Sequence, residues 1–299
     1  VTGETLSDFN GTLSAELYDA ERSVTTYGWG EGKEMVYDDY GSILVSTAAT
    51  VENGVFTLRI AMPEASAQNY RPAALSLYAS STPQAAGEVR TQAAGLFREL
   101  YVYGEAPTAE ADTEAPKIDL LALNHHSFQN GSIVNPSPAI IAEISDNVGI
   151  NTSTTGIGRQ MNAILDGKTV YSQISAGYTP YSDGRPGGSI IYTIENLAEG
   201  AHSLTLRVWD TSGNKAERSI DFYVEKDKAP VIYRVYTDTN PASTVANFYV
   251  SHDRPEAMAT VSVTVYNLLG KPLWTGSAQG PSDMFESVPV SWDLTDSGG

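Results

Sequence analysis

A charged joint containing proline occurs twice in this chain. The first joint runs from Asp112 to Ile118 and the second from Asp227 to Ile232. In both, a polar stretch is followed by Ala-Pro and then by residues suited to a β-strand. Proline cannot continue a central strand ladder, and it pushes the residue before it into extended geometry. Such a step is typical of the connection between small β-sandwich modules.

The two joints predict three modules, at residues 1–112, 113–227 and 228–299. The first two have the length of one β-sandwich of about 100 residues each, and the third is shorter. With 299 residues, of which 41% are hydrophobic and 18% charged, the chain can build two or three packed cores.

Apolar and polar residues alternate with a period of two, which is the pattern of strands with one buried face. The middle module is the clearest. We expect its buried residues to be Ile140, Ala142, Ile144, Met161, Ala163, Leu165, Ile190, Tyr192, Ile194, Leu204, Leu206, Val208, Ile220, Phe222 and Val224. No helical pattern lasts beyond two turns. The sequence therefore predicts an all-β chain of tandem antiparallel immunoglobulin-like β-sandwich modules.

The first module shows the same alternation. The runs from Leu13 to Leu17 and from Phe56 to Met62 predict two of its strands. Asn53-Gly54 precedes the second run, and Asp166-Gly167 follows an alternating run of the middle module. Because both residues of such pairs tolerate a positive φ, we expect hairpin turns there.

Charge and composition exclude several classes of function. The formal charge is −18 and the pI is near 4.5, so the chain repels phosphate backbones and we expect no nucleic-acid binding. No apolar run approaches the length of a membrane span. The absence of cysteine excludes disulfides, thiolate metal ligands and a cysteine nucleophile within these residues. The chain starts at Val1 without a signal peptide, so we expect a fragment or a processed chain.

Two turns of the middle module are rich in oxygen atoms. They span Asp146 to Gly149 and Asp210 to Asn214. Asp and Asn favour turns because their side chains bond to the nearby backbone, and turn formation alone accounts for both segments. The alternative is calcium, which takes about six to eight oxygen ligands, with Asp146, Asp210 and Asn214 as candidate ligands. No other cofactor is expected.

One long loop has the composition of an interface. The segment from Tyr178 to Gly188 contains two Tyr and one Arg, which are enriched where proteins bind one another. Tyr178, Tyr181 and Arg185 are therefore candidate partner-binding residues. The alternative is an ordinary loop between strands with aromatic anchors.

None of the four histidines marks a catalytic site. In a strand, the adjacent His125 and His126 would point to opposite faces and could not hold one ion together, so we interpret them as a loop or strand-edge pair. His202 precedes a strand, and His252 is expected in a turn beside Asp253. Spacing alone positions no Ser-His-Asp triad.

Short motifs of turn and core residues follow one another along the chain. In the first module they are Phe9-Asn10-Gly11-Thr12, Tyr18-Asp19, Thr25-Thr26 and Val51 to Phe56. In the middle module they are Leu123-Asn124, Phe128 with Gly131, Ile140 to Asp146, Gly149-Ile150-Asn151, Gly156-Ile157-Gly158, Leu165-Asp166-Gly167, Tyr178, Gly200 with His202, and Val208-Trp209-Asp210. In the last they are Tyr266 to Lys271 and Trp292-Asp293. In this order and spacing the chain resembles the C-terminal region of the PorU-type family of gingipain-like signal peptidases, or sortases, of the type IX secretion system.

The resemblance implies a large extracytoplasmic protein at the bacterial cell surface or outer membrane, with a Cys–His peptidase domain before Val1. Its implied partners are that domain, outer-membrane components of the type IX system and secreted cargo proteins. The family's nucleophile has no counterpart here, since cysteine is absent. The chain departs from the family at His125-His126. It also ends before the Gly-x-Tyr-x-Tyr strand that follows Trp-Asp in the family, so we expect residues 228–299 to form an incomplete module.

We therefore expect a non-catalytic β-sandwich region of a type IX secretion sortase, which supports the peptidase domain and docks to outer-membrane partners. The alternative is a carbohydrate-binding or adhesin-type surface module, for which tandem sandwiches with exposed Tyr and Trp would also serve. We set aside a complete hydrolase, because no constellation of nucleophile and base is credible in this chain.

Overall fold

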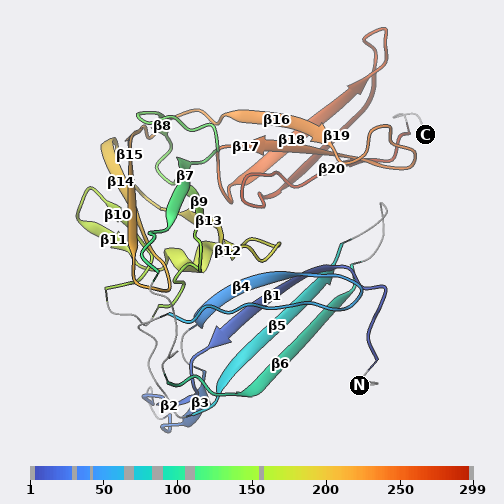
Figure 1. Cartoon of the computed structure of the whole chain (residues 1–299). Coiled ribbons are helices and arrows are strands. Elements are labelled where there is room, and N and C mark those ends of the chain that lie inside the picture. The colour runs from blue at the N-terminus through green and yellow to red at the C-terminus, as the bar shows by residue number, and fades with distance from the viewer. Residues whose placement is uncertain are drawn as a thin grey trace. The chain divides into compact units, whose positions relative to one another are not determined.

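The computed structural model describes residues 4–28, 32–40, 43–63, 71–82, 90–104, 112–154 and 158–295 (Figure 1). All regular structure in these ranges is β-strand, apart from the short 3₁₀ helix η1 at Ile174–Gly177. The predicted all-β fold with antiparallel sheets is confirmed. Gly156 and Ile157 of the family motif lie outside the described residues.

Among the described residues, no helix has both the length and the hydropathy needed to cross a membrane.

The chain forms two compact units. Unit 1 contains Val1–Leu121, Ala142–Ile191 and Leu204–Ser219, and unit 2 contains Ala122–Ile141, Tyr192–Ser203 and Ile220–Gly299. The division into modules at residues 112 and 227 stays a prediction.

One antiparallel sheet of unit 1 has the strand order β4-β1-β5-β6 (Figure 1). Its strands are β1 (Gly11–Tyr18), β4 (Ile43–Val51), β5 (Ala73–Ser81) and β6 (Gln92–Leu100), and a separate two-stranded ribbon joins β2 (Arg22–Thr25) to β3 (Val36–Asp39). Leu13, Ala15 and Leu17 alternate on β1 and are all buried, as expected. Between them lie polar or half-buried residues, so β1 contributes one apolar face.

The expected strand from Phe56 to Met62 is wrong, because this segment belongs to no sheet. The turn before it is correct: Asn53 and Gly54 have φ of 52° and 75°, and Glu52 and Val55 exchange backbone hydrogen bonds of 2.9 Å. Beyond the turn the backbone leaves the ladder. Half-buried apolar side chains of the segment still pack against the sheet, namely Leu58, Ile60 and Met62. The alternating pattern therefore marks side chains that pack against the sheet. An extended segment can place them there without pairing with a strand.

Two further sheets contain the strands of the middle of the chain, in the orders β11-β10-β14-β15-β8 and β12-β13-β9-β7. The strands are β7 (Lys117–Leu123), β8 (Ile133–Val134), β9 (Ala139–Ser145), β10 (Asn162–Leu165), β11 (Thr169–Tyr171), β12 (Tyr178–Pro180), β13 (Gly187–Thr193), β14 (Gly200–Trp209) and β15 (Lys215–Val224). β8 runs parallel to β15, whereas β10 pairs antiparallel with β11 and with β14.

The apolar residues expected in the core of these sheets are buried, except Tyr192, which is half-buried. Leu204, Leu206 and Val208 of β14 have no exposed surface at all. Asp166 and Gly167, with φ of 52° and 64°, form the predicted turn between β10 and β11. The period of two thus located the buried faces correctly.

The last strands have fewer buried residues. A sheet of order β16-β17-β20 is built from β16 (Ile232–Thr237), β17 (Ala246–His252) and β20 (Val290–Trp292), and β18 (Met258–Tyr266) pairs with β19 (Pro272–Pro281) as a hairpin. Ala246 and Val290 are buried, whereas Leu268 and Leu269 at the tip of the hairpin are 106% and 93% exposed. The expectation that this module is incomplete stays a prediction.

Replacing Leu206 by Ala should lower the free energy of unfolding by about 2–5 kcal/mol, because it leaves a cavity in a wholly buried site. Thr205→Ala should cost well under this, since Thr205 is only half-buried and its hydroxyl bonds to that of Ser219 at the surface, at 2.8 Å. Chemical denaturation of both variants measures the difference. Equal costs would mean that the register of β14 is wrong by one residue.

Candidate functional site

Three carboxylates from separate segments of unit 1 meet at one place. Asp112 lies in the first joint, Asp146 follows the end of β9, and Asp210 follows the end of β14. One oxygen of each lies within 4.8 Å of those of the other two. Asp210 has no exposed surface, and the other two are half-buried. The fold therefore brings together the two oxygen-rich turns that the sequence singled out.

Backbone hydrogen bonds hold the two turns against each other. The Asn151 N–H donates to the Trp209 carbonyl, and the Thr211 N–H donates to the Gly149 carbonyl, both at 2.9 Å. Ile150 and Asp210 form an isolated antiparallel bridge at the same point. The closeness of the carboxylates thus follows from backbone pairing.

Each turn also bonds its own carboxylate. Asp146 Oδ2 accepts from the N–H groups of Val148 and Gly149, both at 2.8 Å. The oxygens of Asp210 accept from the backbone N–H and the side-chain Nδ2 of Asn214, both at 2.7 Å. These are bonds that Asp and Asn make in turns whether or not an ion is present.

Asp112 connects the first joint to both turns. Its Oδ1 accepts from Asn147 Nδ2 at 2.9 Å and from the Glu114 N–H at 3.1 Å, and its carbonyl accepts from Asn214 Nδ2 at 3.1 Å. The hydrogen bond from Asn147 is the largest of the effects that lower the pKa of Asp112. Sequence reasoning identified Asp112 only as part of a joint. Its place among the ligand candidates depends on contacts across about a hundred residues, for which the local sequence has no signal.

Two oxygens in this cluster have no protein partner. Asp112 Oδ2 and Asp146 Oδ1 are both buried and accept no hydrogen bond. Burial raises the pKa of Asp146, and the nearby charges of Asp210 and Asp112 raise it further. Within the described ranges, no Lys, Arg or His forms an ion pair with any of the three carboxylates. Asn214, the third predicted ligand, has its Nδ2 directed at acceptors and serves as a hydrogen-bond donor.

Of the candidate partner-binding residues, Tyr181 and Arg185 lie on the tight connection between β12 and β13, whereas Tyr178, expected in a loop, is the first residue of β12. The Tyr181 N–H donates to the Gly187 carbonyl at 3.1 Å, and the Gly184 N–H donates to the Tyr181 carbonyl at 3.1 Å. Gly187 has φ of 135°, and a Cβ there would lie 2.4 Å from the Ile144 carbonyl oxygen. The glycine therefore lets this loop lie close against β9.

The half-buried Tyr181 and the exposed Arg185 form one unit on this loop. The Arg185 guanidinium lies 3.7 Å from the centre of the Tyr181 ring, and its Nε lies 3.3 Å from the Asp183 carboxylate. The side chains of Arg185 and Asp183 are both 61% exposed. Arginine stacked on tyrosine is pre-organised for recognising a partner, because less rotamer freedom is lost on binding.

Tyr178 has a different environment from Tyr181. Its ring packs against Gly188, where a Cβ would come within 2.7 Å of the ring. Burial raises the pKa of its hydroxyl. Tyr178 therefore packs within the fold, whereas Tyr181 and Arg185 contribute to the surface of the loop.

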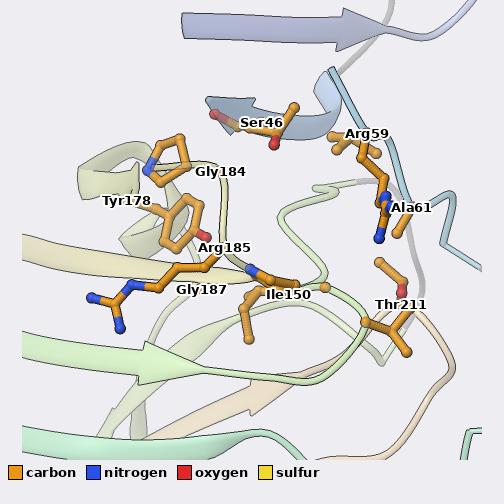
Figure 2. Close-up of a pocket in the computed structure, with 15 residues that line it drawn as sticks. Ser46, Arg59, Ala61, Ile150, Tyr178, Gly184, Arg185, Gly187 and Thr211 are labelled. Atoms are coloured by element: carbon orange, nitrogen blue, oxygen red, sulfur yellow. The ribbon is translucent and has the colours of Figure 1, made fainter. Parts of the chain in front are cut away.

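A small pocket lies beside this loop in unit 1 (Figure 2). Tyr178, Ser46, Arg59, Ile150 and Thr211 are among the residues that line it, and in Figure 2 the Arg185 guanidinium points away from Arg59. Its volume is about 50 Å³, which suits a few water molecules and is too small for a sugar ring.

A larger open groove of about 700 Å³ borders the same loop. Val55 and Phe56 contribute exposed apolar surface to it, while Arg59 and Asp183 contribute charges of opposite sign. Apolar surface bordered by charged groups is typical of a protein-binding surface.

The four histidines occupy structural positions. His125 stacks on Tyr233, with ring centres 4.0 Å apart, and lies beyond the end of β7 with His126, so the loop interpretation of this pair is correct. His202 stacks on Phe222 at 5.6 Å. His252 was expected in a turn, but it is the last residue of β17 and is only 5% exposed. The described residues place no His in a cluster that could bind a metal.

His252 is held in its neutral form. Its Nδ1 accepts a hydrogen bond of 3.1 Å from the Arg254 N–H, so the proton resides on Nε2, which lies 2.8 Å from the Ser282 hydroxyl. Burial is the main cause that lowers the pKa of His252, and the Arg254 charge lowers it further, against the opposing effect of Asp253.

Fold and sites together define an all-β chain, mainly of antiparallel sheets, with a carboxylate cluster and a loop that carries the Tyr181–Arg185 stack. It has no thiol, so these residues are not a cysteine peptidase.

No protein-family model matches the chain, and no curated protein matches its sequence. Among solved structures, it is similar to dimeric latent PorU from Porphyromonas gingivalis, with 26% identity over 99% of this chain and 27% of that chain, at a TM-score of 0.44. This is the type of protein that the sequence motifs resemble. The Bacteroides ovatus glucan-utilisation protein SGBP-B, in complex with a mixed-linkage heptasaccharide, is 10% identical over 98% of this chain and 89% of that chain, at a TM-score of 0.22. Both TM-scores are low, so neither likeness by itself assigns a fold or a function.

Acid should destabilise the sheet that contains β17. Because the folded state lowers the pKa of His252 below the unfolded value of 6.5, its neutral form stabilises the fold above that pH, and this contribution is lost as the pH falls through the lower, folded-state pKa. We expect His252→Gln to flatten the decline in unfolding free energy between about pH 7 and pH 5, measured by urea titration. The exposed His126→Gln is the control and should leave the decline unchanged. A decline that is equally steep without His252 would contradict this assignment.

Proposed function

We propose that this chain is the non-catalytic C-terminal β-sandwich region of a gingipain-family sortase of the type IX secretion system. In that role it supports the peptidase domain and docks to outer-membrane partners. The protein acts outside the cytoplasm, at the bacterial cell surface. The peptidase chemistry belongs to a Cys–His pair outside these residues.

The observation that carries this proposal is where the family-like motifs fall in the fold. Asn53-Gly54 and Asp166-Gly167 occupy turns in which both residues have a positive φ. Val208 is wholly buried, and Asp210 is wholly buried at the junction of two turns. Turns with positive φ favour Asn or Asp followed by Gly, and a buried strand position needs an apolar residue such as Val208. A shared order of such motifs therefore supports a shared scaffold.

The docking part of the proposal is supported by the surface around the loop between β12 and β13. The Arg185–Tyr181 stack borders the groove with Val55 and Phe56, because Asp183 and Gly184, which lie between Tyr181 and Arg185 in the chain, line that groove. Aromatic and arginine side chains are the residues that most often dominate binding energy at protein interfaces. The proposed partners are outer-membrane components of the type IX system, secreted cargo proteins and the peptidase domain itself.

A carbohydrate-binding or adhesin-type module is the alternative, and the same loop argues against the first form of it. Sugar rings stack on open aromatic faces, but one face of Tyr181 is covered by Arg185, and Tyr178 is packed against Gly188. The pocket beside them is too small for a sugar ring. A protein partner, which can contact the arginine itself, fits this surface better.

The purified chain should have no peptidase activity. Because it contains no cysteine, incubation with a type IX C-terminal signal-domain substrate should give no cleavage, and thiol-directed inhibitors should label nothing. Gel electrophoresis and intact-mass measurement check both results. Cleavage by this chain would refute the proposal that its role is non-catalytic.

Tyr181→Ala and Arg185→Ala should each weaken docking by about fivefold or more, because they remove the aromatic and cationic parts of the Tyr181–Arg185 stack. The immobilised chain is incubated with detergent-solubilised outer membranes of a bacterium that uses type IX secretion, and bound type IX components are quantified by mass spectrometry. Arg207→Ala, on β14 and paired with Glu217, is the matched control and should bind like the wild type. Retention of the same components by all three variants would show that this loop does not dock them.

A further inference from the structure

The carboxylate cluster contains a feature that turn formation does not explain. Asp146 makes its turn bonds with Oδ2 alone, and Asp112 makes its bonds to Asn147 and Glu114 with Oδ1 alone. The other oxygen of each, Asp146 Oδ1 and Asp112 Oδ2, is buried without a hydrogen bond. A buried acceptor without a partner is costly, and natural proteins rarely contain one unless a water or an ion satisfies it.

The charge balance of the cluster also favours a cation. Three carboxylates converge with ligand oxygens within 4.8 Å of one another, and Asp210 among them is wholly buried. The groups that contact them in the described structure are neutral donors, such as Asn147, Asn214 and backbone N–H groups. Neutral donors orient carboxylates, but they do not cancel like charges at this separation.

We propose that Asp112, Asp146 and Asp210 bind one Ca²⁺ ion. The two unpartnered oxygens, Asp112 Oδ2 and Asp146 Oδ1, and a carboxylate oxygen of Asp210 are its protein ligands, and water completes the shell. The hydroxyl of Ser212, which is close enough to Asp112 to help lower its pKa, is a further oxygen at the same place. The donor set contains only oxygen, which suits a hard cation and excludes a thiolate or imidazole zinc site.

Calcium fits the cluster better than magnesium. The ligands come from three separate segments, and two of these are turns fixed by backbone pairing between Asn151 and Trp209 and between Thr211 and Gly149. Calcium tolerates irregular oxygen cages, whereas magnesium requires near-octahedral geometry and keeps most of its water. The ion's role is structural: it ties the first joint at Asp112 to the turns that follow β9 and β14.

The test uses calcium chloride as the only ligand, added to chelator-treated protein. Isothermal titration should show one Ca²⁺ per chain, and Ca²⁺ should raise the melting temperature relative to EDTA, because it binds the folded state. Asp112→Asn and Asp146→Asn should each lower the affinity for Ca²⁺ about tenfold or more and shrink the thermal shift, since ligand charge sets calcium affinity. Magnesium chloride at the same concentration should shift the melting temperature less.

Two controls make the outcome decisive. Asp221→Asn removes one carboxylate from the exposed face of β15, and it should bind Ca²⁺ like the wild type. Circular dichroism of each variant establishes that it is folded, and using both Asp112→Asn and Asp146→Asn avoids dependence on the wholly buried Asp210. The proposal is overturned if folded wild-type protein binds no Ca²⁺, if the two variants bind it as the wild type does, or if Mg²⁺ binds equally well. None of these outcomes depends on the proposed role in secretion.

Discussion

Every strand of this chain has to satisfy its backbone in a ladder and keep one face away from water. In the described residues there is no α-helix to cover an open face, so sheets and extended segments must cover one another. β9 shows how strong this requirement is, because its residues from Ala139 to Ala142 are buried on both faces. The turn that follows β9 lies against the turn that follows β14. The Thr211 N–H joins the two turns by donating a hydrogen bond to the Gly149 carbonyl.

The parts of the fold that depend on local patterns could be read from the sequence. Alternation located the buried faces of β1 and β14, and positive-φ residue pairs such as Asp166-Gly167 located the turns. The segment from Phe56 to Met62 marks the limit of that reasoning. Its side chains Leu58, Ile60 and Met62 pack on the sheet, yet whether a backbone joins a ladder is decided by neighbours far away in the chain.

The candidate sites show the same division between local and distant information. Asp146 and Asp210 were identified from turn composition, but their meeting with Asp112 required the tertiary fold. Tyr178 and Tyr181 look equivalent in the sequence, and only packing separates them, since one lies against Gly188 and the other is stacked under Arg185. His252 was misplaced because Asp253 suggested a turn, whereas bonds to Ser282 and Arg254 hold it within the sheet.

The hydrogen bond from Asn214 to the carbonyl of Asp112 closes a loop of 102 residues. During synthesis the first joint therefore cannot take its final form until the turn after β14 has left the ribosome. At about 5–20 residues per second this is a delay of roughly 5–20 s. Until then Asp112 can have only the partners that lie nearer in the chain, the Glu114 N–H and Asn147. The order in which the chain emerges thus leaves the joint without this contact until the turn after β14 has been made.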